Sequence, residues 1–383
     1  MLHAIAAKRH ERFVEALREM VDIDCGSYTP EGVNRIADLC QARFEAGGWK
    51  IERTPHRPAE GEAQLGDLVI GRLPGAGGPR ILLIGHTDTV FDAGTAAARP
   101  FRIEGERAFG PGVSDMKGGL LGAFFALEAL QATGFEGFGS VTHVCNPDEE
   151  IGSPFSGPVI GELAKEADVA LVFEGARANG DVVSARKGVT DYRVEIVGRA
   201  AHAGVEPEKG RSAVLEAAHK TIALSALNAR WPGVTVNVGI VHGGTRTNVV
   251  PERSTLEIDL RSPEEKTLVA AEEEIQRILS EPVVPDVEIA VHRNGWHRPM
   301  EKKEDTARLV GIAKEVAAEL GLELRDASTG GASDANTTSA AGVPTLDGLG
   351  PVGGDDHAPG EWIDLRSVVP RIALVAGLVS RLP

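Results

Sequence analysis

The stretch MKGGLLGAFFALEALQA (116–132) decides the fold, because apolar residues cover nearly the whole circumference of the helix that it predicts. A helix without a polar face is expected to be buried. Apolar runs typical of strands flank it on both sides: DLVIGRL (67–73), RILLIGH (80–86), SVTHVCN (140–146) and DVALVFE (168–174). Mostly apolar strands separated by helices predict an α/β domain with a largely parallel sheet between two layers of helices.

The pattern changes near residue 188. From there the chain predicts a strand (189–198), a helix (211–228), two strands (234–241 and 254–261), a helix (264–280) and a last strand (287–293). This β-α-β-β-α-β order is typical of a ferredoxin-like domain. A chain of 383 residues is also too long for one ordinary core. We therefore expect a discontinuous main domain (1–187 and 298–383) with an inserted domain (188–297).

Composition excludes several classes of protein. The net charge of −16 argues against a nucleic-acid partner, since binding to phosphates needs a surplus of Lys and Arg. The sequence contains no stretch of about 18 apolar residues, so it predicts no membrane-spanning helix. Three widely spaced cysteines and an N-terminus without the apolar run of a signal peptide favour a cytoplasmic protein, or a periplasmic one if a leader has been removed.

Side chains that bind metals gather where the predicted strands end. They are His86 and Asp88 after the second strand, Glu149 and Glu150 after the third, Glu174 at the end of the fourth, and Asp115 in the turn before the buried helix. Sites in open α/β sheets lie just beyond the carboxyl ends of the strands. We therefore expect these segments to meet on one rim of the sheet.

Each of these residues also has a simpler interpretation. Asp115 alone would more often be a helix N-cap. The Glu149–Glu150 pair alone would more often be a solvated turn, and the HxD pattern at His86 could be a polar strand end. Together, however, so many carboxylates on one rim are costly to bury without a cation. The combination favours a metal site.

Counting charges indicates the number of ions. Two divalent ions carry four positive charges, which three carboxylates (Asp115, Glu150 and Glu174) and one hydroxide would balance. Neutral His86 and a second neutral histidine would complete the ligands. This balance suits a hydrolytic site with two metal ions about 3.5–4 Å apart. Mixed imidazole and carboxylate ligands favour Zn²⁺, for which Co²⁺ or Mn²⁺ could substitute.

Six motifs together resemble those of the M20 metallopeptidase family, and within it the bacterial glutamate carboxypeptidases of the carboxypeptidase G2 type. They are GHTDTV (85–90), GPGVSDMKGG (110–119), NPDEEIGS (146–153), FEGAR (173–177), GRAAHAGVEPEKG (198–210) and GGDDH (353–357). The resemblance extends over nearly the whole chain. It implies that the main domain binds two zinc ions per subunit and that the inserted domain is a lid and forms a homodimer.

The resemblance also implies a role for each site residue. Asp115 would bridge the two ions, His86 and Glu174 would bind one of them, and Glu150 and His357 the other. The peptide bond after Asp115 would be cis.

Two further carboxylates would act beside the ions. Asp88 would orient His86, a common role for a carboxylate next to a zinc-bound histidine. Glu149 would be the general base, taking a proton from the attacking water and delivering it to the leaving amine.

Further residues would contact the substrate. By resemblance, His202 reaches the active site of the partner subunit and stabilises the oxyanion, and Asn248 has a similar role. Arg261 would hold the free carboxylate of the substrate through a bidentate pair. Without the family, His202 would more often be a loop histidine, and Arg261 could equally be a surface arginine.

The glycine-rich loop TGGASDAN (329–336) resembles a substrate loop of the family. Gly330 and Gly331 would let its backbone approach the substrate closely.

The expected function is a di-zinc carboxypeptidase that cleaves the amide bond to a C-terminal amino acid, glutamate or another acidic residue, from a small peptide or an N-acyl amino acid. An alternative with the same metal ligands is an N-acyl-amino-acid deacylase, such as an acetylornithine deacetylase or a succinyl-diaminopimelate desuccinylase. A remote alternative is an inactive binding protein on the same fold. Such a protein would be expected to lack a ligand or the base, whereas this chain retains candidates for all of them.

Overall fold

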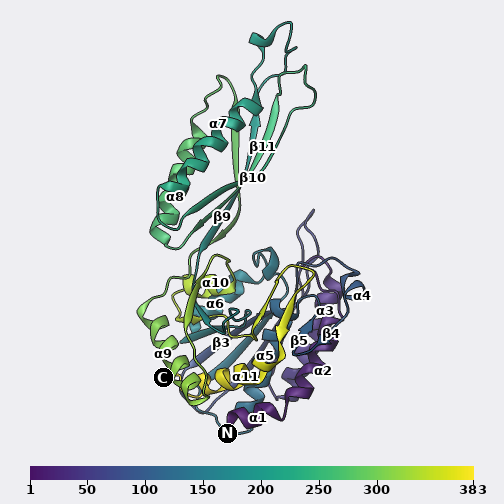
Figure 1. Cartoon of the computed structure of the whole chain (residues 1–383), viewed down its shortest axis with the longest axis vertical. Helices are drawn as coiled ribbons and strands as arrows, with labels where there is room; N and C mark the ends of the chain where they lie inside the picture. Colours follow the sequence, from purple (N-terminus) through teal and green to yellow (C-terminus); the bar gives the residue numbers. More distant parts are fainter. The chain divides into compact units, whose positions relative to one another are not determined.

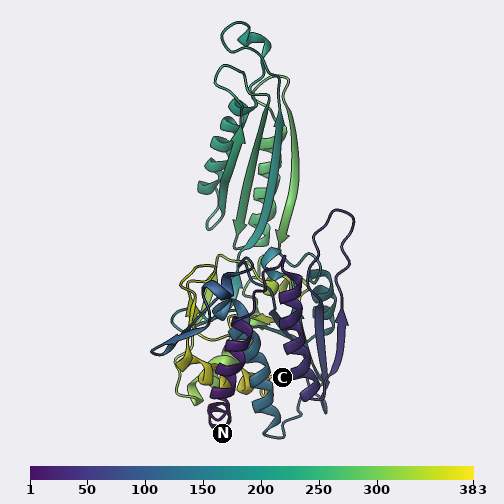
Figure 2. The ribbon, with the colours of Figure 1, turned by 90° about the vertical axis from the view of Figure 1, so that its right-hand side faces the viewer.

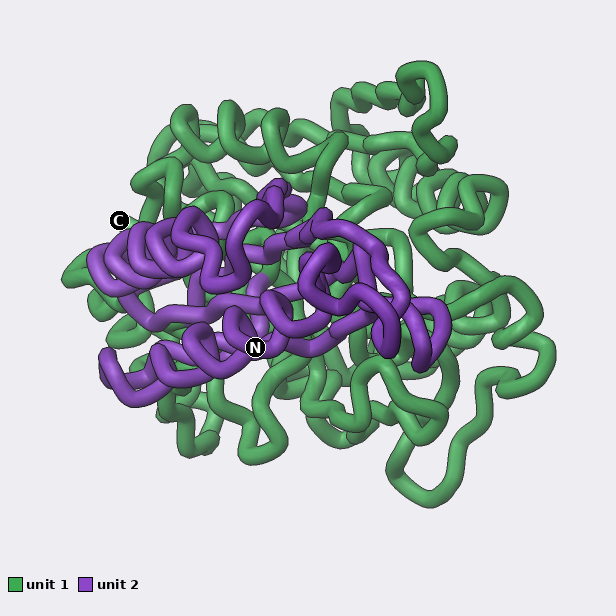
Figure 3. Tube along the Cα trace, turned by 90° about the horizontal axis from the view of Figure 1, so that it is seen from above, with its two compact units in different colours: residues 1–185, 302–329, 333–383 green, residues 186–301, 330–332 purple.

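The computed structural model describes residues 1–383 and divides into two compact units (Figure 3). Unit 1 comprises Met1–Ala185, Lys302–Thr329 and Ser333–Pro383. Unit 2 comprises Arg186–Glu301 and the short segment Gly330–Ala332. The sequence had placed the inserted domain at 188–297, and nothing in its pattern pointed to the second, three-residue segment.

The centre of unit 1 is a six-stranded sheet (Figure 1). Its strands, in spatial order, are β1 (Lys50–Thr54), β2 (Leu68–Pro74), β6 (Ser140–Asn146), β3 (Arg80–His86), β7 (Val169–Val172) and β14 (Thr345–Leu346). The four strands from β6 to β14 pair in parallel, and β2 runs antiparallel to both of its neighbours. The predicted largely parallel sheet is thus confirmed.

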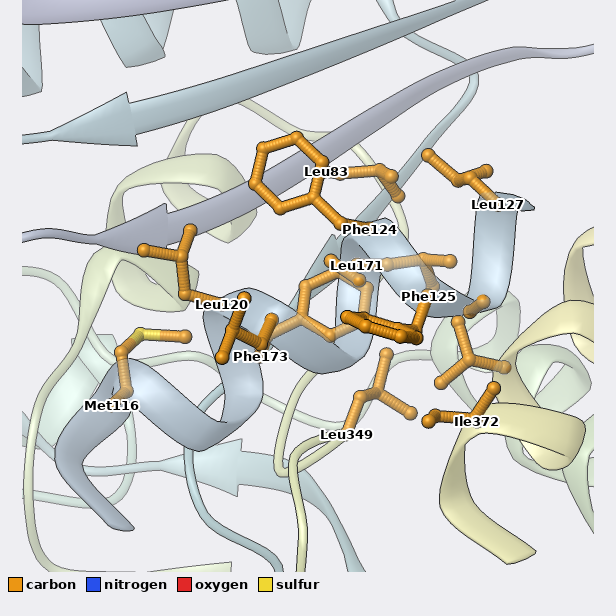
Figure 4. Packing of buried hydrophobic residues seen from close by; sticks show 14 of the residues in the cluster. Leu83, Met116, Leu120, Phe124, Phe125, Leu127, Leu171, Phe173, Leu349 and Ile372 are labelled. Carbon is orange, nitrogen blue, oxygen red and sulfur yellow. The ribbon is translucent and has the colours of Figure 1, made fainter. Parts of the chain in front are cut away.

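The predicted central helix is α5 (Gly118–Gln131), in which every residue except Glu128 and Gln131 is buried. Its side chains interleave with Leu83 and Leu171 of the sheet and with Ile372 of α11 (Leu365–Val379) (Figure 4). A helix enclosed by a sheet and a second helix has no face left for water, which is why its sequence shows no polar stripe.

Helices cover both faces of this sheet. Successive residues of a strand point to opposite faces, so a strand that is buried along its length is covered on both sides. Leu83 belongs to the core around α5, and its neighbours Leu82 and Ile84 are buried as well. The core around α5 also includes α1 (Leu2–Ala7), α2 (His10–Val21), α3 (Pro30–Ala46) and α9 (Glu304–Glu319). Two further helices contact the sheet, α6 (Gly157–Glu166) at β3 and α10 (Asp334–Ala340) at β7.

Two small sheets and some short helical segments complete unit 1. The first sheet has the order β15 (Gly353–Gly354), β16 (Trp362–Asp364), β5 (Arg107–Phe109) and β4 (Arg102–Glu104). It joins the C-terminal segment to the chain before α5. The other pairs β13 (Asp326–Thr329) with β8 (Val182–Arg186). The short segments are α4 (Thr95–Ala98) and the helical turns Val113–Lys117 and Glu149–Ile151.

Unit 2 has the predicted β-α-β-β-α-β order (Figure 2): β9 (Gly188–Val197), α7 (Ala213–Ser225), β10 (Thr235–Gly243), β11 (Arg253–Ser262), α8 (Glu265–Ser280) and β12 (Glu288–His297). Helical turns at Pro207–Lys209 and Ala226–Ala229 complete it. Its sheet is antiparallel throughout, in the order β10-β11-β9-β12. Alternate residues of β9 and β11 form a second core with α7 and α8. This is the strand order of a ferredoxin-like fold.

No helix in the molecule has both the length and the apolar character needed to cross a membrane. All three cysteines are buried and free.

Candidate active site

The parallel strands deliver the candidate ligands to one edge of the sheet. His86, the last residue of β3, pairs with Asn146, the last residue of β6. The turn Glu149–Ile151 begins three residues after the end of β6, and Glu174 lies two residues beyond the end of β7. Because the three strands run in the same direction, these residues emerge side by side.

Asp115 lies between two histidines, His86 and His357, that are far apart in the sequence. His86 Nε2 is 3.0 Å from Asp115 Oδ1, and His357 Nε2 is 3.0 Å from Asp115 Oδ2. Each histidine has one further carboxylate beside it: Glu174 Oε1 lies 3.8 Å from His86 Nε2, and Glu150 Oε2 lies 3.2 Å from His357 Nε2. The five predicted ligands therefore form one cluster with Asp115 at its centre.

The backbone around Asp115 is irregular, and its carboxylate does not cap α5. The Asp115–Met116 peptide bond is cis, as the resemblance implied. The residue before α5 is Lys117, which is buried and donates from Nζ to Ile23 O and Pro111 O. The simpler interpretation of Asp115 as an N-cap therefore does not apply, and its side chain is turned to the two histidines.

Asp88 connects His86 to the glutamate turn. Its backbone carbonyl oxygen is the hydrogen-bond partner of His86 Nδ1 at 3.0 Å, and its Oδ1 lies 3.4 Å from the same nitrogen. Its carboxylate accepts hydrogen bonds of 3.2 Å each from the backbone N–H groups of Glu149 and Glu150. Ser27 Oγ also donates to it, at 2.7 Å. The backbone carbonyl of Asp88 thus holds the ring of His86, with the carboxylate nearby, and the carboxylate holds the turn in place.

The charges in this cluster are strongly coupled. Burial, together with the nearby Glu174, Asp334 and Glu150, raises the pKa of Glu149 well above its ordinary value. Burial likewise raises the pKa of Glu150. Hydrogen bonds to Asp115 and Glu150 raise the pKa of His357 to about 10. The cluster therefore holds more negative charge than the low-dielectric surroundings favour.

These residues fit a site for divalent cations. The donors are imidazole nitrogens and carboxylate oxygens, the mixture that Zn²⁺ accepts. Glu150 Oε1 is buried without a hydrogen-bond partner, an arrangement that is costly for a carboxylate oxygen unless a cation compensates it. Two groups of three potential ligands have their atoms within 4.8 Å of one another: His86, Glu149 and Glu174, and His86, Asp115 and Glu150.

The predicted substrate residues of unit 2 lie in two places. His202 and Asn248 are on neighbouring exposed loops, which are joined by a backbone hydrogen bond of 3.0 Å from Ala203 N to Asn248 O. His202 Nδ1 accepts from Gly204 N at 3.2 Å. The structure thus brings these two side chains to one part of unit 2.

The second group consists of Arg261 and the glycine-rich loop with Gly330 and Gly331. Arg261 Nη1 donates to Gly330 O at 2.8 Å, and Arg186 Nη1 donates to Gly331 O at 3.1 Å. The rest of the Arg261 guanidinium is paired with Asp259, at 2.9 Å for the closest contact. The sequence had not suggested that a neighbouring carboxylate already holds this arginine.

Comparison with known proteins gives the family. The peptidase family M20/M25/M40 matches residues 82–381. The chain belongs to this family. It is therefore a hydrolytic enzyme of the M20 metallopeptidases, a family that depends on metal ions.

Individual relatives align with almost the whole length of this chain. Carboxypeptidase G2 of Pseudomonas sp. (strain RS-16) is 29% identical over 100% of this chain and 92% of its own. A succinyl-diaminopimelate desuccinylase of Leptothrix cholodnii is 27% identical, over 90% and 92% of the two chains. Among solved structures, aminopeptidase PepT from Bacillus cereus superposes with a TM-score of 0.79 at 24% identity, covering 97% of this chain and 98% of its own. The last comparison shows the fold alone.

Two buried carboxylates beside the M20 cluster were not singled out from the sequence. Glu361 accepts hydrogen bonds from the backbone N–H groups of Gly112, Ser114 and Asp115, at 2.8–3.0 Å. Asp334 accepts from Asn146 Nδ2 at 2.7 Å and from Ser153 Oγ at 2.6 Å.

Burial raises the pKa of Glu361 to about 7 and that of Asp334 to about 6. The sequence signal that could have pointed to these two acids is their position. Asp334 lies within TGGASDAN, and Glu361 lies four residues after His357, the last residue of GGDDH.

Proposed function

We propose that this M20 enzyme binds two zinc ions and cleaves the amide bond to a C-terminal amino acid with an acidic side chain, glutamate above all. The observation that carries the proposal is the position of Asp115 between His86 and His357, with Glu149 beside the cluster. This arrangement provides ligands for two ions and leaves one carboxylate for proton transfer.

The ligands divide into two sets that share Asp115. His86 and Glu174 would hold one ion, and Glu150 and His357 the other. Bound zinc would supply Lewis-acid chemistry, polarising the substrate carbonyl and lowering the pKa of water. Asp88 keeps His86 in the orientation that presents Nε2 to Asp115.

Glu149 is the residue that moves the proton. It lies beside His86 and Glu174, the expected ligands of one ion, and is not itself needed to complete either ligand set. Burial and surrounding carboxylates raise its pKa, so that it can accept a proton from the attacking water and donate it to the leaving amine.

Arg261 supports the preference for a substrate with a free carboxylate. Its guanidinium already forms a pair with the carboxylate of Asp259 and reaches the loop at Gly330. A substrate carboxylate would use the same fork geometry in place of, or beside, Asp259.

A pocket beside the Glu149–Ile151 turn supports a large acyl group. It encloses about 680 Å³. Its lining includes Tyr28, His56, Leu65, Ile151 and Phe155. An acetyl group would fill a small part of this volume, whereas a peptidyl or larger apolar acyl group would bury more surface in it. A pocket of this size next to Ile151 would accommodate the acyl part of a carboxypeptidase substrate.

The surface of unit 2 supports a homodimer. β10 is an edge strand, with Ile240 and Val241 exposed by 42% and 49%. The contacting helix α7 exposes Leu215 by 51% and Ile222 by 71%. An edge strand beside exposed apolar side chains is costly in water and suits pairing with a second copy. In such a dimer His202 would serve the partner's active site.

The second candidate is an N-acyl-amino-acid deacylase, which is favoured by the likeness to the succinyl-diaminopimelate desuccinylase. A panel of N-benzoyl-glutamate, N-acetyl-glutamate, N-acetylornithine, N-succinyl-diaminopimelate and neutral dipeptides, tested with zinc-loaded and chelated enzyme, separates the candidates. The proposal predicts the highest kcat/KM for N-benzoyl-glutamate. Preference for N-acetylornithine or N-succinyl-diaminopimelate would replace it with the second candidate.

A further inference from the structure

Glu361 holds the loop that carries Asp115. Its carboxylate accepts three backbone hydrogen bonds, from Gly112 N at 2.9 Å to Oε2 and from Ser114 N at 2.8 Å and Asp115 N at 3.0 Å to Oε1. The side chain is almost completely buried, with a relative exposure of 1%. The backbone dihedrals of Asp115 and Met116 are not helical, so helix geometry does not set the position of Asp115, and the three bonds to Glu361 hold it.

The same residue belongs to the loop that carries His357. Glu361 N donates to Ala358 O at 3.2 Å, one residue after His357, and β16 begins directly after Glu361 and pairs with β5. His357 itself has a φ of +63°, which residues with a side chain rarely adopt. A loop in such a conformation persists only where its surroundings hold it.

We propose that Glu361 is a positioning residue that sets the separation between Asp115 and His357, and thereby the affinity of the site for the cation that these two residues share. Glu361 holds the backbone of the loop that carries Asp115, and it is itself part of the loop that carries His357. This role rests on the proposed two-metal site and adds to it a residue outside the ligand set.

The chemistry of the side chain explains why a carboxylate is needed. Both oxygens of Glu361 accept, so all three N–H groups are satisfied at once. In Glu361→Gln one of these oxygens becomes an NH₂ group, which would face a backbone N–H as donor against donor. The size of the side chain is conserved, and the loop is expected to shift to relieve the contact.

Glu216 provides a matched control. It is fully buried in unit 2 and also accepts backbone hydrogen bonds, from Val283 N at 2.9 Å and Val284 N at 2.6 Å, in addition to an ion pair with Lys220. Glu216→Gln therefore removes the same kind of interaction from a place without candidate metal ligands.

The experiment measures zinc binding by competition with a chromogenic chelator, and the unfolding temperature of the metal-free protein, for wild type, Glu361→Gln and Glu216→Gln. Glu361→Gln is expected to weaken the binding of one of two zinc ions on the order of 10- to 100-fold, the usual effect of losing a residue that supports metal ligands. Glu216→Gln is expected to lower the unfolding temperature while binding both ions as wild type does.

A wild-type zinc affinity in Glu361→Gln would overturn the inference and leave the proposed function standing. Absence of zinc binding by the wild type would overturn both. If Glu361→Gln does not fold, Glu361→Asp keeps the charge but shortens the side chain. It should weaken the same zinc ion, and an unchanged affinity in that variant would equally overturn the inference.

Discussion

His357 Nε2 lies 3.0 Å from Asp115 Oδ2, although 242 positions separate the two residues in the chain. The contact exists because the small sheet joins β16 to β5, which brings the C-terminal loop against the loop before α5. The two halves of the candidate metal site are therefore assembled by tertiary structure and not by a local motif.

Removing His357 should release one ion. We expect His357→Ala to bind one zinc per chain and to lose activity by at least about 10²-fold, because the remaining ion cannot stabilise both reacting oxygens. Metal analysis after dialysis and steady-state kinetics measure both effects. His292→Ala, which alters an exposed histidine of β12, is the control and should retain both ions and full activity. Two tightly bound ions in His357→Ala would contradict its assignment as a ligand.

Replacing Glu149 should separate catalysis from metal binding. Glu149→Gln keeps the shape of the side chain but cannot accept a proton, so kcat should fall by roughly 10²- to 10⁴-fold. Zinc content should stay at the wild-type value, since the other five residues supply the ligands. Turnover within a few-fold of the wild type would show that another residue is the base.

The role of His202 can be tested by mixing inactive variants. His202→Ala should lower kcat by about 10²- to 10³-fold through loss of an oxyanion donor, with unchanged zinc content. If His202 serves the partner subunit, unfolding and refolding an equal mixture of His202→Ala and Glu149→Gln should restore roughly a quarter of the wild-type activity, because half of the dimers then contain one complete site. Recovery of no activity would contradict a shared site.

Acid stability should depend on His143. This residue is fully buried among the rings of Phe44, Phe124 and Phe173, and burial lowers its pKa from 6.5 to about 3. Below pH 6.5 His143 therefore binds a proton in the unfolded chain but not in the folded chain. The free energy of unfolding falls as the pH falls. The contribution is about 1.4 kcal/mol for each pH unit in that window.

His143→Leu should remove this dependence. Urea unfolding at pH 7.5 and pH 5.5 measures the change in the free energy of unfolding for both proteins, and the difference between the two pH values should be smaller in the variant by about 1 kcal/mol. An identical pH dependence in the two proteins would show that His143 is not the group responsible.

The sequence predicted the central strands and the site residues at their ends for a physical reason. Buried parallel strands give continuous apolar runs, so β3, β6 and α5 were located to within about two residues. Once those strands are parallel, His86, Glu150 and Glu174 must emerge at one edge.

Other parts of the fold left no such pattern. The antiparallel position of β2 between β1 and β6 depends on packing between distant segments, and β14 has only two residues. Glu361 and Asp334 lie in or near quoted motifs, but their roles were not visible in the sequence because their partners lie 246 and 188 positions away. A buried acid that accepts from backbone or amide groups looks in sequence like any surface acid.

The most direct test of the proposed two-zinc site is a crystal structure of the zinc-loaded protein with anomalous diffraction data collected on both sides of the zinc edge. We expect two anomalous peaks about 3.5–4 Å apart, one on each side of the Asp115 carboxylate. One peak would lie against His86 and Glu174, and the other against Glu150 and His357. Zinc bound elsewhere, or no zinc between Asp115 and the two histidines, would contradict it.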